Sequence, residues 1–223
     1  MNTESLKLFS YWRSSAAYRV RIGLNLKGLA YEQSPVHLLR DGGEQHGQAF
    51  AATNPQKLIP VLQHGERMLR QSMAILEYLD EVWAEPALMP ATARGRARVR
   101  ALGLLVACDI HPLNNLRVLR YLEHEWNVPQ PERDVWVKHW IAEGFSAMEA
   151  LLAGDPATGA FCEGDSPTLA DCCLVPQVYN ARRFGLDLSP FPEIRRIEAA
   201  CQALPAFQQA HPENQPDAPR QGG

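Results

Sequence analysis

The sequence has no long apolar run and no leader-like beginning. Although 46% of its residues are hydrophobic, no apolar stretch approaches the roughly 18 residues that a membrane-spanning helix requires. The first residues, MNTESLKLF, lack a basic region followed by an extended apolar segment, unlike a secretory signal. We therefore expect a cytoplasmic protein with no membrane partner.

The chain also lacks a large excess of charge of either sign. Its 22 Lys and Arg residues nearly balance its 25 Asp and Glu residues, for a net charge of −3. A nucleic-acid-binding surface requires a basic excess, so we expect no nucleic-acid partner. The seven histidines are scattered without the spacing of metal ligands, so we expect no metal site.

Cysteine is scarce, and its pattern disfavours two kinds of structure. The five residues include no Cys-x-x-Cys pair, and their number is odd. We therefore expect neither a disulfide framework nor a zinc site. We interpret all five as reduced, buried, small apolar side chains: Cys108, Cys162, Cys172, Cys173 and Cys201.

The first part of the chain alternates between strand-like and helix-like patterns. With 223 residues, the chain can form one large domain or two small ones. In residues 1–83, β-type runs and amphipathic segments predict the order βαβ, then a loop at DGGEQHG with a possible short helix, then ββα. The expected strands are 6–11, 31–35, 61–63 and 68–70, and the expected helices are 18–27 and 72–82.

The second part of the chain reads as helical. Residues 84–93 carry two prolines and almost no charge, which is typical of a linker. Helices are expected at 94–111, 113–126, 133–152, 169–184 and 193–203, and a polar, proline-rich tail from Pro212. The predicted fold class is therefore α/β plus all-α, with a small α/β domain in residues 1–83 and an all-helical domain in 94–223.

Two polar pairs stand where helices are predicted to start. Ser14 and Ser15 follow the first strand, and Gln71 and Ser72 precede the helix at Met73. A serine in such a position is most often an N-cap. The free N–H groups and the dipole of a helix start also favour a carboxylate or a thiolate. The two interpretations are compatible.

Pro60 stands directly before a predicted strand. It is either a rigid trans turn or a cis-proline that leaves the backbone of Ile59 open to an extended ligand. The residues alone favour the trans turn, because only about 5–6% of X–Pro bonds are cis.

Further polar segments have structural interpretations of their own. Thr168 and Asp171, in TLAD, have the outline of a capping box. The polar side chains of HPLNNLR, from His111 to Arg117, interrupt a helical region and are more typical of caps than of ligands. Arg183 and its neighbour would complement the C-terminal dipole of a helix. Arg13 follows a strand end, where binding residues often project.

The order of several segments resembles that of one family. SSAAYRVRIGL, from Ser14 to Leu24, is similar to the SSCSxRVRIAL signature of the zeta-class glutathione transferases. The similarity runs from Lys7 to Pro219 and implies a thioredoxin-like glutathione-binding domain followed by a helical glutathione-transferase C-terminal domain. The segments that resemble the maleylacetoacetate isomerase branch are NPQKLIPVL, QSMAILEYLDE, CDIHPLNNLRVLRYL, TLADCCLVPQV, NARRFGLDLSPFP and HPENQPDAP.

The resemblance also implies a set of site residues. Ser14 would be the catalytic hydroxyl beside the glutathione sulfur, with Ser15 as its catalytic neighbour. Pro60 would be cis. The substrate carboxylates would be held by arginines, whose guanidinium groups match carboxylate geometry. The expected glutathione contacts are Ser14, Ser15, Gln45, Ile59, Gln71, Ser72, His111 and Asn115, and the expected substrate contacts are, in order of preference, Arg183, Arg13 and Arg117.

The implied activity is the glutathione-dependent cis–trans isomerisation of maleylacetoacetate, a small dicarboxylate of aromatic amino acid catabolism. Glutathione would be the cofactor, its thiolate adding reversibly to the C=C bond, and the protein would be a homodimer. Ala16 departs from the signature, which has cysteine there. Three alternatives stay open: maleylpyruvate isomerisation, general glutathione conjugation, and a non-catalytic binding module. The arginines argue against conjugation, and the Ser14 hydroxyl argues against the binding module.

Overall fold

The computed structural model describes residues 4–219 of the chain, which form two compact units. The first unit comprises the chain up to Leu88 together with the segment from Ala203 onward, and the second comprises Met89–Gln202. The C-terminal segment therefore groups with the first unit, whereas the sequence analysis placed it in the helical domain. None of the helices in residues 4–219 has the length and apolar content needed to cross a bilayer.

A four-stranded mixed sheet forms the centre of the first unit. Its strands are β1 (Leu6–Ser10), β2 (Glu32–Pro35), β3 (Val61–His64) and β4 (Arg67–Arg70), in the order β2-β1-β3-β4. Strand β2 runs parallel to β1, and β3 runs antiparallel to both of its neighbours. The predicted order of elements is confirmed, with strand boundaries that differ by a residue or so.

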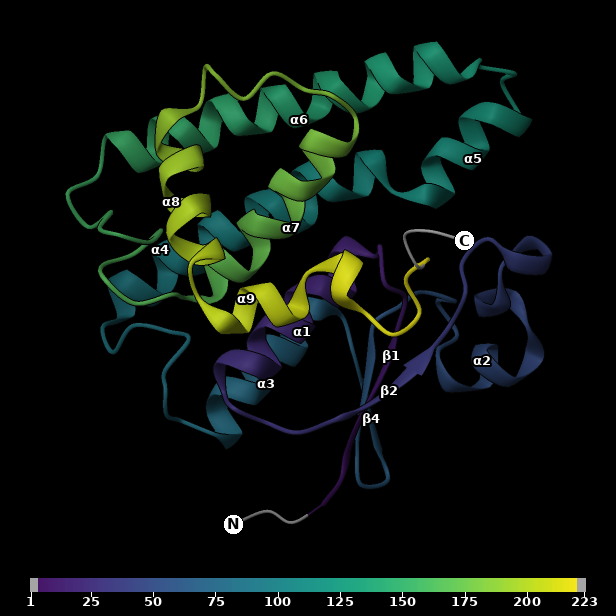
Figure 1. The fold of residues 1–223 in the computed structure, drawn as a ribbon, viewed down its shortest axis with the longest axis horizontal. Coiled ribbons are helices and arrows are strands. Elements are labelled where there is room, and N and C mark those ends of the chain that lie inside the picture. The colour runs from purple at the N-terminus through teal and green to yellow at the C-terminus, as the bar shows by residue number, and fades with distance from the viewer. Residues whose placement is uncertain (1–3, 220–223) are drawn as a thin grey trace. The chain divides into compact units, whose positions relative to one another are not determined.

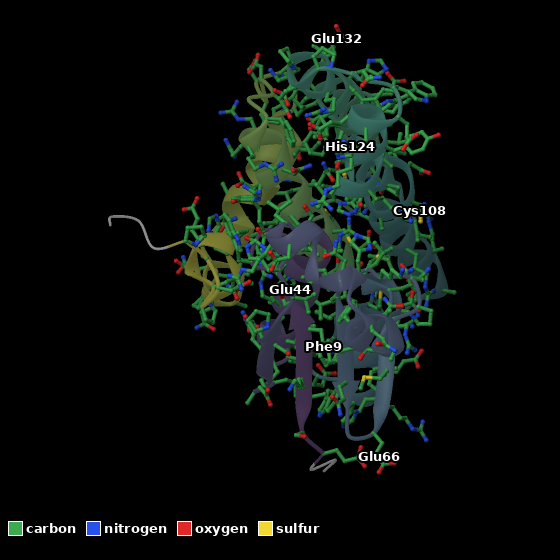
Figure 2. The ribbon with its side chains drawn as sticks, turned by 90° about the vertical axis from the view of Figure 1, so that its right-hand side faces the viewer. Phe9, Glu44, Glu66, Cys108, His124 and Glu132 are labelled. Carbon is green, nitrogen blue, oxygen red and sulfur yellow. The ribbon has the colours of Figure 1, made fainter. Side chains whose placement is uncertain are left out.

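The register brings several chain junctions to one end of this sheet. Val61 pairs with Phe9 on one side and with Arg70 on the other, and Ser10 pairs with Pro35. The exits of β1, β2 and β4 and the entrance to β3 therefore share one end, called here the junction end. In Figure 2, Glu66 marks the β3–β4 turn, and Glu44 lies at the opposite end of the sheet, beyond Phe9.

Three helices cover the two faces of the sheet: α1 (Ser15–Leu26), α2 (Gln48–Thr53) and α3 (Ser72–Val82). Figure 1 shows α1 and α3 on one side of the sheet and α2 on the other. Alternate residues of β1 face opposite sides: Leu8 packs against α1 and α3, and Phe9 lies with the cluster that contains Phe50 of α2. The helix predicted at 18–27 begins three residues earlier, at Ser15, and Gly28 follows it with a φ of 64°.

The C-terminal segment is anchored on this unit by hydrogen bonds. It contains α9 (Pro205–Ala210) and a 3-10 turn, Pro212–Asn214. Asn25 Nδ2 and Arg21 Nε on α1 donate to the carbonyl oxygens of Ala206 and Ala210, at 3.0 and 3.1 Å. Helix α9 was not predicted, because a helix of six residues that begins at one proline and ends shortly before another shows too little periodicity to be recognised.

The second unit is built from α4 (Ala93–Leu104), α5 (Leu116–His124), α6 (Gln130–Ala153), α7 (Leu169–Arg183) and α8 (Pro192–Gln202). Each overlaps one of the five predicted helices. Two boundaries were wrong. After Leu104 the chain forms a π-helical turn, Leu105–Ile110, and then a 3-10 turn, His111–Asn114, so α5 begins at Leu116. Pro112, which cannot donate a backbone hydrogen bond, is the second residue of the 3-10 turn.

The start of α7 confirms the predicted capping box. The Asp171 carboxylate accepts hydrogen bonds from the Thr168 N–H at 2.7 Å and from the Cys162 N–H at 2.9 Å. Burial raises the pKa of Asp171 above its ordinary value, and these hydrogen bonds counter part of that rise. The carboxylate therefore joins the loop before α7 to the helix itself.

Candidate functional site

The junction between β1 and α1 carries Arg13, Ser14 and Ser15. Ser14 is the N-cap of α1, as predicted, and its Oγ accepts a hydrogen bond from the Ala17 N–H at 3.3 Å. The first turn of α1 contains no acidic residue, so no carboxylate of its own compensates the positive end of the helix dipole. All three predicted site residues here are partly exposed.

A buried arginine that the sequence analysis did not single out holds this junction. Arg21 is fully buried and donates to the carbonyl oxygens of Tyr11 and Trp12 at 3.4 and 2.9 Å and to Ser10 Oγ at 3.1 Å. The Trp12 N–H in turn donates to Asp217 of the C-terminal segment at 2.9 Å. The loop that presents Ser14 is thus fixed from two sides.

The junction between β4 and α3 carries Gln71 and Ser72. The N-cap of α3 is Gln71 and not Ser72 as predicted; Ser72 is the first helical residue, and no side chain caps this helix. Ser72 Oγ instead accepts a hydrogen bond from Arg19 Nη1 at 3.1 Å. Gln71 has a φ of 69°, a left-handed conformation that costs free energy in a residue other than glycine and is often found at functional sites.

The turn before β3 contains the predicted cis-proline. The Ile59–Pro60 peptide bond is cis, as the resemblance implied. Asn54 supports the preceding loop, since its Nδ2 donates to the Leu58 carbonyl at 2.7 Å. Ile59 is buried and directly precedes Pro60 at the junction end.

Gln45 lies on a 3-10 turn, Glu44–His46, in the segment expected to be a loop with a possible short helix. Glu44 Oε2 accepts from the His37 N–H at 2.7 Å, and the His37 ring contacts that of Tyr11 with centroids 5.0 Å apart. This turn is therefore joined to the junction end. Gln45 is 6% exposed, yet its Oε1 has no hydrogen-bond partner within residues 4–219.

Together these groups suit an anionic, peptide-like ligand such as glutathione. Neither α1 nor α3 has an acidic residue in its first turn, so both helix starts favour a negative charge. Ser14 and Ser72 accept hydrogen bonds through their oxygens, so each can still donate its own proton. The buried acceptor of Gln45 can receive an N–H from a ligand.

The remaining predicted residues lie in the second unit. Asn115 caps α5 by accepting from the Arg117 N–H at 3.2 Å, and its Nδ2 lies 3.3 Å from His111 Nε2. The cap interpretation of this segment is confirmed. Arg117 is exposed, and so is Arg183, whose guanidinium lies 4.5 Å from the Phe184 ring centroid.

A second polar pair in this unit was missed. Asn180 Nδ2 on α7 donates to Asn114 Oδ1 at 3.1 Å, and both residues are buried. Asn114 Nδ2 also donates to the Ile110 carbonyl at 3.0 Å. The bond ties the break between α4 and α5 to α7. The sequence shows two asparagines in this break but gives no signal for their distant partner.

The cysteines are free, and four are buried as predicted. Cys108 is the correction: it is exposed, because it lies two residues from the buried Val106 and Ile110 and so on the opposite side of this helical segment. Burial raises the pKa of the Cys162 and Cys201 thiols, and the nearby Asp171 raises it further. Within residues 4–219, no group of histidine, cysteine and acidic side chains could hold a metal ion.

Comparison with known proteins places the chain among glutathione transferases. A model of the glutathione S-transferase N-terminal domain matches residues 4–81. A probable maleylacetoacetate isomerase of Vibrio cholerae is 54% identical over 214 residues, which cover 96% of this chain and 99% of that protein.

Two solved structures show the same fold over nearly the whole chain. A maleyl pyruvate isomerase, a bacterial zeta-class glutathione S-transferase in its holo form, is 52% identical with a TM-score of 0.93; the match covers 96% of this chain and 100% of that one. A maleylacetoacetate isomerase from Methylobacterium extorquens AM1, with bound malonate and glutathione, is 41% identical with a TM-score of 0.92 and the same coverage. The chain belongs to the zeta-class glutathione transferase family, with its thioredoxin-like domain and its helical domain.

Proposed function

We propose that the chain is a glutathione-dependent cis–trans isomerase that converts maleylacetoacetate to fumarylacetoacetate. The observation that carries the proposal is that α1 and α3 both have a serine at their start, Ser14 or Ser72, and have no acidic residue in their first turn. The chain that shows this arrangement is 54% identical to a probable maleylacetoacetate isomerase. When bound, glutathione supplies a thiolate that adds reversibly to the C=C bond and lets it rotate as a single bond. The chain must favour that thiolate, hold the tripeptide and bind two carboxylates.

Ser14 is the residue we assign to the thiolate. Its Oγ already accepts from the Ala17 N–H, so its proton can be donated to sulfur. A hydrogen bond to the charged form, together with the start of α1, lowers the pKa of a thiol. Ser15, the first residue of α1, adds a second hydroxyl at the same helix start.

Gln45, Ile59, Gln71 and Ser72 are the residues we assign to the rest of the tripeptide. The buried Oε1 of Gln45, which has no hydrogen-bond partner within residues 4–219, supports this role. The positive φ of Gln71, next to the buried Ser72, supports it as well. From the second unit, we assign His111 and Asn115 to the cofactor by the family resemblance. Their mutual contact of 3.3 Å keeps the two side chains together.

Arg183, Arg13 and Arg117 are our candidates for the substrate carboxylates, in that order. The Arg183 guanidinium lies over the Phe184 ring and that of Arg13 lies 5.1 Å from the Trp12 ring centroid. Stacking orients a guanidinium while its N–H groups still point outward in its own plane, which suits a bidentate carboxylate contact. Arg182 forms an ion pair with Glu198 at 2.7 Å.

Maleylpyruvate is the second candidate substrate, because the structure with a TM-score of 0.93 is that of a maleyl pyruvate isomerase. The two substrates differ by one methylene, which is worth about 1–3 kcal/mol, or roughly 10–200-fold. The test is kcat/KM for both substrates at saturating glutathione. We expect the higher value for maleylacetoacetate. Faster turnover of maleylpyruvate would make this assignment wrong, and glutathione conjugation of aromatic electrophiles without isomerase activity would overturn the proposed reaction.

The arginine assignment predicts unequal effects of neighbouring substitutions. Arg183→Met and Arg13→Met should each lower kcat/KM at least about tenfold, or about 1.4 kcal/mol. Arg182→Met is the matched control and should change it little, because the Arg182 side chain is exposed and paired with Glu198. Equal losses from Arg182→Met and Arg183→Met would contradict the assignment.

The protein's assembly and location complete the proposal. We propose a homodimer, by the family resemblance, with the small domain of each subunit against the helical domain of its partner. A cytoplasmic location is supported by five free cysteines, which suit a reducing compartment. The substrate would derive from the breakdown of an aromatic ring.

A further inference from the structure

A buried arginine on α1 contacts the helix start that we assign to glutathione. Arg19 is 2% exposed and Ser72 is 6% exposed. Arg19 Nη1 donates to Ser72 Oγ at 3.1 Å, across 53 residues of sequence. The contact joins the second turn of α1 to the first turn of α3.

The same helix pair makes a second close contact one turn further along. A Cβ atom on Gly23 would lie 2.3 Å from Leu76 Cδ2, so α1 and α3 approach closely there. Gly23 follows Arg19 by four residues, and Leu76 follows Ser72 by four. The two helices therefore run in the same direction, and the Arg19–Ser72 contact belongs to a tightly packed seam that limits the movement of both side chains.

The direction of the Arg19–Ser72 hydrogen bond has a chemical consequence. A guanidinium has only donors and stays protonated in proteins, so Ser72 Oγ must be the acceptor. The Ser72 O–H then has to donate elsewhere. Within residues 4–219 this hydroxyl donates no hydrogen bond, and it does not cap α3. Ser72 is thus held as a hydrogen-bond donor, which suits a carboxylate, a group that only accepts.

We propose that Arg19 is a positioning residue for glutathione: by donating to Ser72 Oγ, it keeps the Ser72 hydroxyl as a donor to the α-carboxylate of the γ-glutamyl group. This inference rests on the proposed function, in which Ser72 binds that end of the tripeptide. It adds that the effect of the buried Arg19 is on the binding of the γ-glutamyl α-carboxylate. Arg19 itself does not touch the ligand and acts through the serine.

The test is calorimetric titration with two ligands. One is glutathione, and the other is γ-aminobutyryl-cysteinyl-glycine, which lacks only the α-carboxylate of the γ-glutamyl group. In Arg19→Met we expect the Kd for glutathione to rise about tenfold, the size of a weakened charge-assisted hydrogen bond, with little change for the analogue. The kcat at saturating glutathione should stay within about twofold of wild type, because the reacting sulfur is bound elsewhere.

Two controls separate this role from general damage. Arg67→Met removes the same charge at the far end of the same sheet, where Arg67 pairs with His64, and it should leave both Kd values unchanged. In a Ser72→Ala background, Arg19→Met should weaken glutathione binding by less than about twofold, since the serine through which it acts is gone. If Arg19→Met does not fold, Arg19→Gln replaces it in every comparison.

The outcomes are distinct. Selective loss of glutathione affinity supports the inference. Unchanged glutathione affinity in the Arg19 variant, equal losses for both ligands, or full additivity with Ser72→Ala overturns it. Failure of the wild-type protein to bind glutathione at all would refute the proposed function itself.

Discussion

Each of the two helix starts carries a serine hydroxyl that accepts one internal hydrogen bond. Ser14 Oγ accepts from the backbone of α1, and Ser72 Oγ accepts from Arg19. Because a serine hydroxyl has one donor and two acceptor positions, the internal bond leaves its proton available. Capping and ligand binding at Ser14 are therefore compatible, in agreement with the interpretation of the sequence. At Ser72 the internal partner is a buried side chain in place of a cap.

Replacing Ser14 should raise the pKa of the glutathione thiol. A hydrogen bond to a charged group contributes about 1.5–3 kcal/mol, so Ser14→Ala should raise the thiol pKa of the bound cofactor by about 1–2 pH units. Turnover at neutral pH should fall about tenfold and recover partly as the pH rises, because more thiolate then forms. Thiolate absorbance and kcat measured against pH report both effects. Ser14→Thr, which retains the hydroxyl, should keep the lower pKa; an equal rise in Ser14→Thr would contradict the role.

Alkylation should leave the activity largely intact. Position 16 carries alanine, and Cys162, Cys172, Cys173 and Cys201 are buried. Iodoacetamide should react mainly with the exposed Cys108, and measured turnover with fresh glutathione should then be close to that of the untreated enzyme. Cys108→Ser is the control. Rapid inactivation of the wild type that Cys108→Ser prevents would place that thiol in the active site, against our interpretation.

At the scale of elements, the parallel packing of α1 and α3 brings two helix starts to one end of the sheet. Gly23 permits this packing, because a side chain there would meet Leu76. Arg21 and the C-terminal segment hold the loop that leads into α1. The positions of Ser14 and Ser72 thus depend on contacts made one to three turns away along the helices.

Gly23→Ala should be destabilising although alanine favours helices. The gain in helix propensity is about 1 kcal/mol, whereas overpacking a buried contact costs about 1–3 kcal/mol. We expect a lower free energy of unfolding in urea and weaker glutathione binding. In a Leu76→Ala background, which removes the clashing side chain, the same change should cost less. A Gly23→Ala protein with wild-type or higher stability would show that the packing of α1 against α3 accommodates a side chain at position 23, against our expectation.

At the scale of the whole molecule, the residues that we assign to cofactor and substrate binding come from both units. The first unit carries the groups assigned to the thiol and the tripeptide, and the second carries Arg117, Arg183, His111 and Asn115. Each unit also presents large apolar side chains to solvent, among them Val82 at 39% exposure on α3 and Leu104 at 41% on α4. These are candidates for burial between subunits of the proposed homodimer.

Light scattering at micromolar concentration should give twice the chain mass of 24.9 kDa. Leu104→Glu should shift the protein toward monomer, because an interface does not readily bury an unpaired carboxylate. Leu151→Glu is the matched control, since Leu151 on α6 is 52% exposed and is not assigned to the interface. A monomeric wild type, or equal dissociation by both variants, would contradict this assembly.

The sequence alone determined the element types, the helix caps at Ser14 and Thr168, and the family of this protein, because the signals for them are local. Alternating and helical periodicities reported the element types, and Ser14 and Thr168 each preceded a helix as a cap does. The order of short motifs along the chain led to the family and to a glutathione-dependent isomerase, in agreement with the relatives. The family resemblance also led to a cis Pro60, which base rates alone would have rejected.

Only the tertiary structure decided which distant residues meet. Nothing local in the sequence connects Arg19 to Ser72, Arg21 to Ala210, or Asn114 to Asn180. The N-cap of α3 is Gln71, where the chain turns with a positive φ, and Cys108 lies on the side of its helical segment opposite the buried Val106 and Ile110. Periodicity describes the face that a residue presents along its own helix. Packing determines what that face meets, and that is why the partners of the buried arginines appear only in the folded chain.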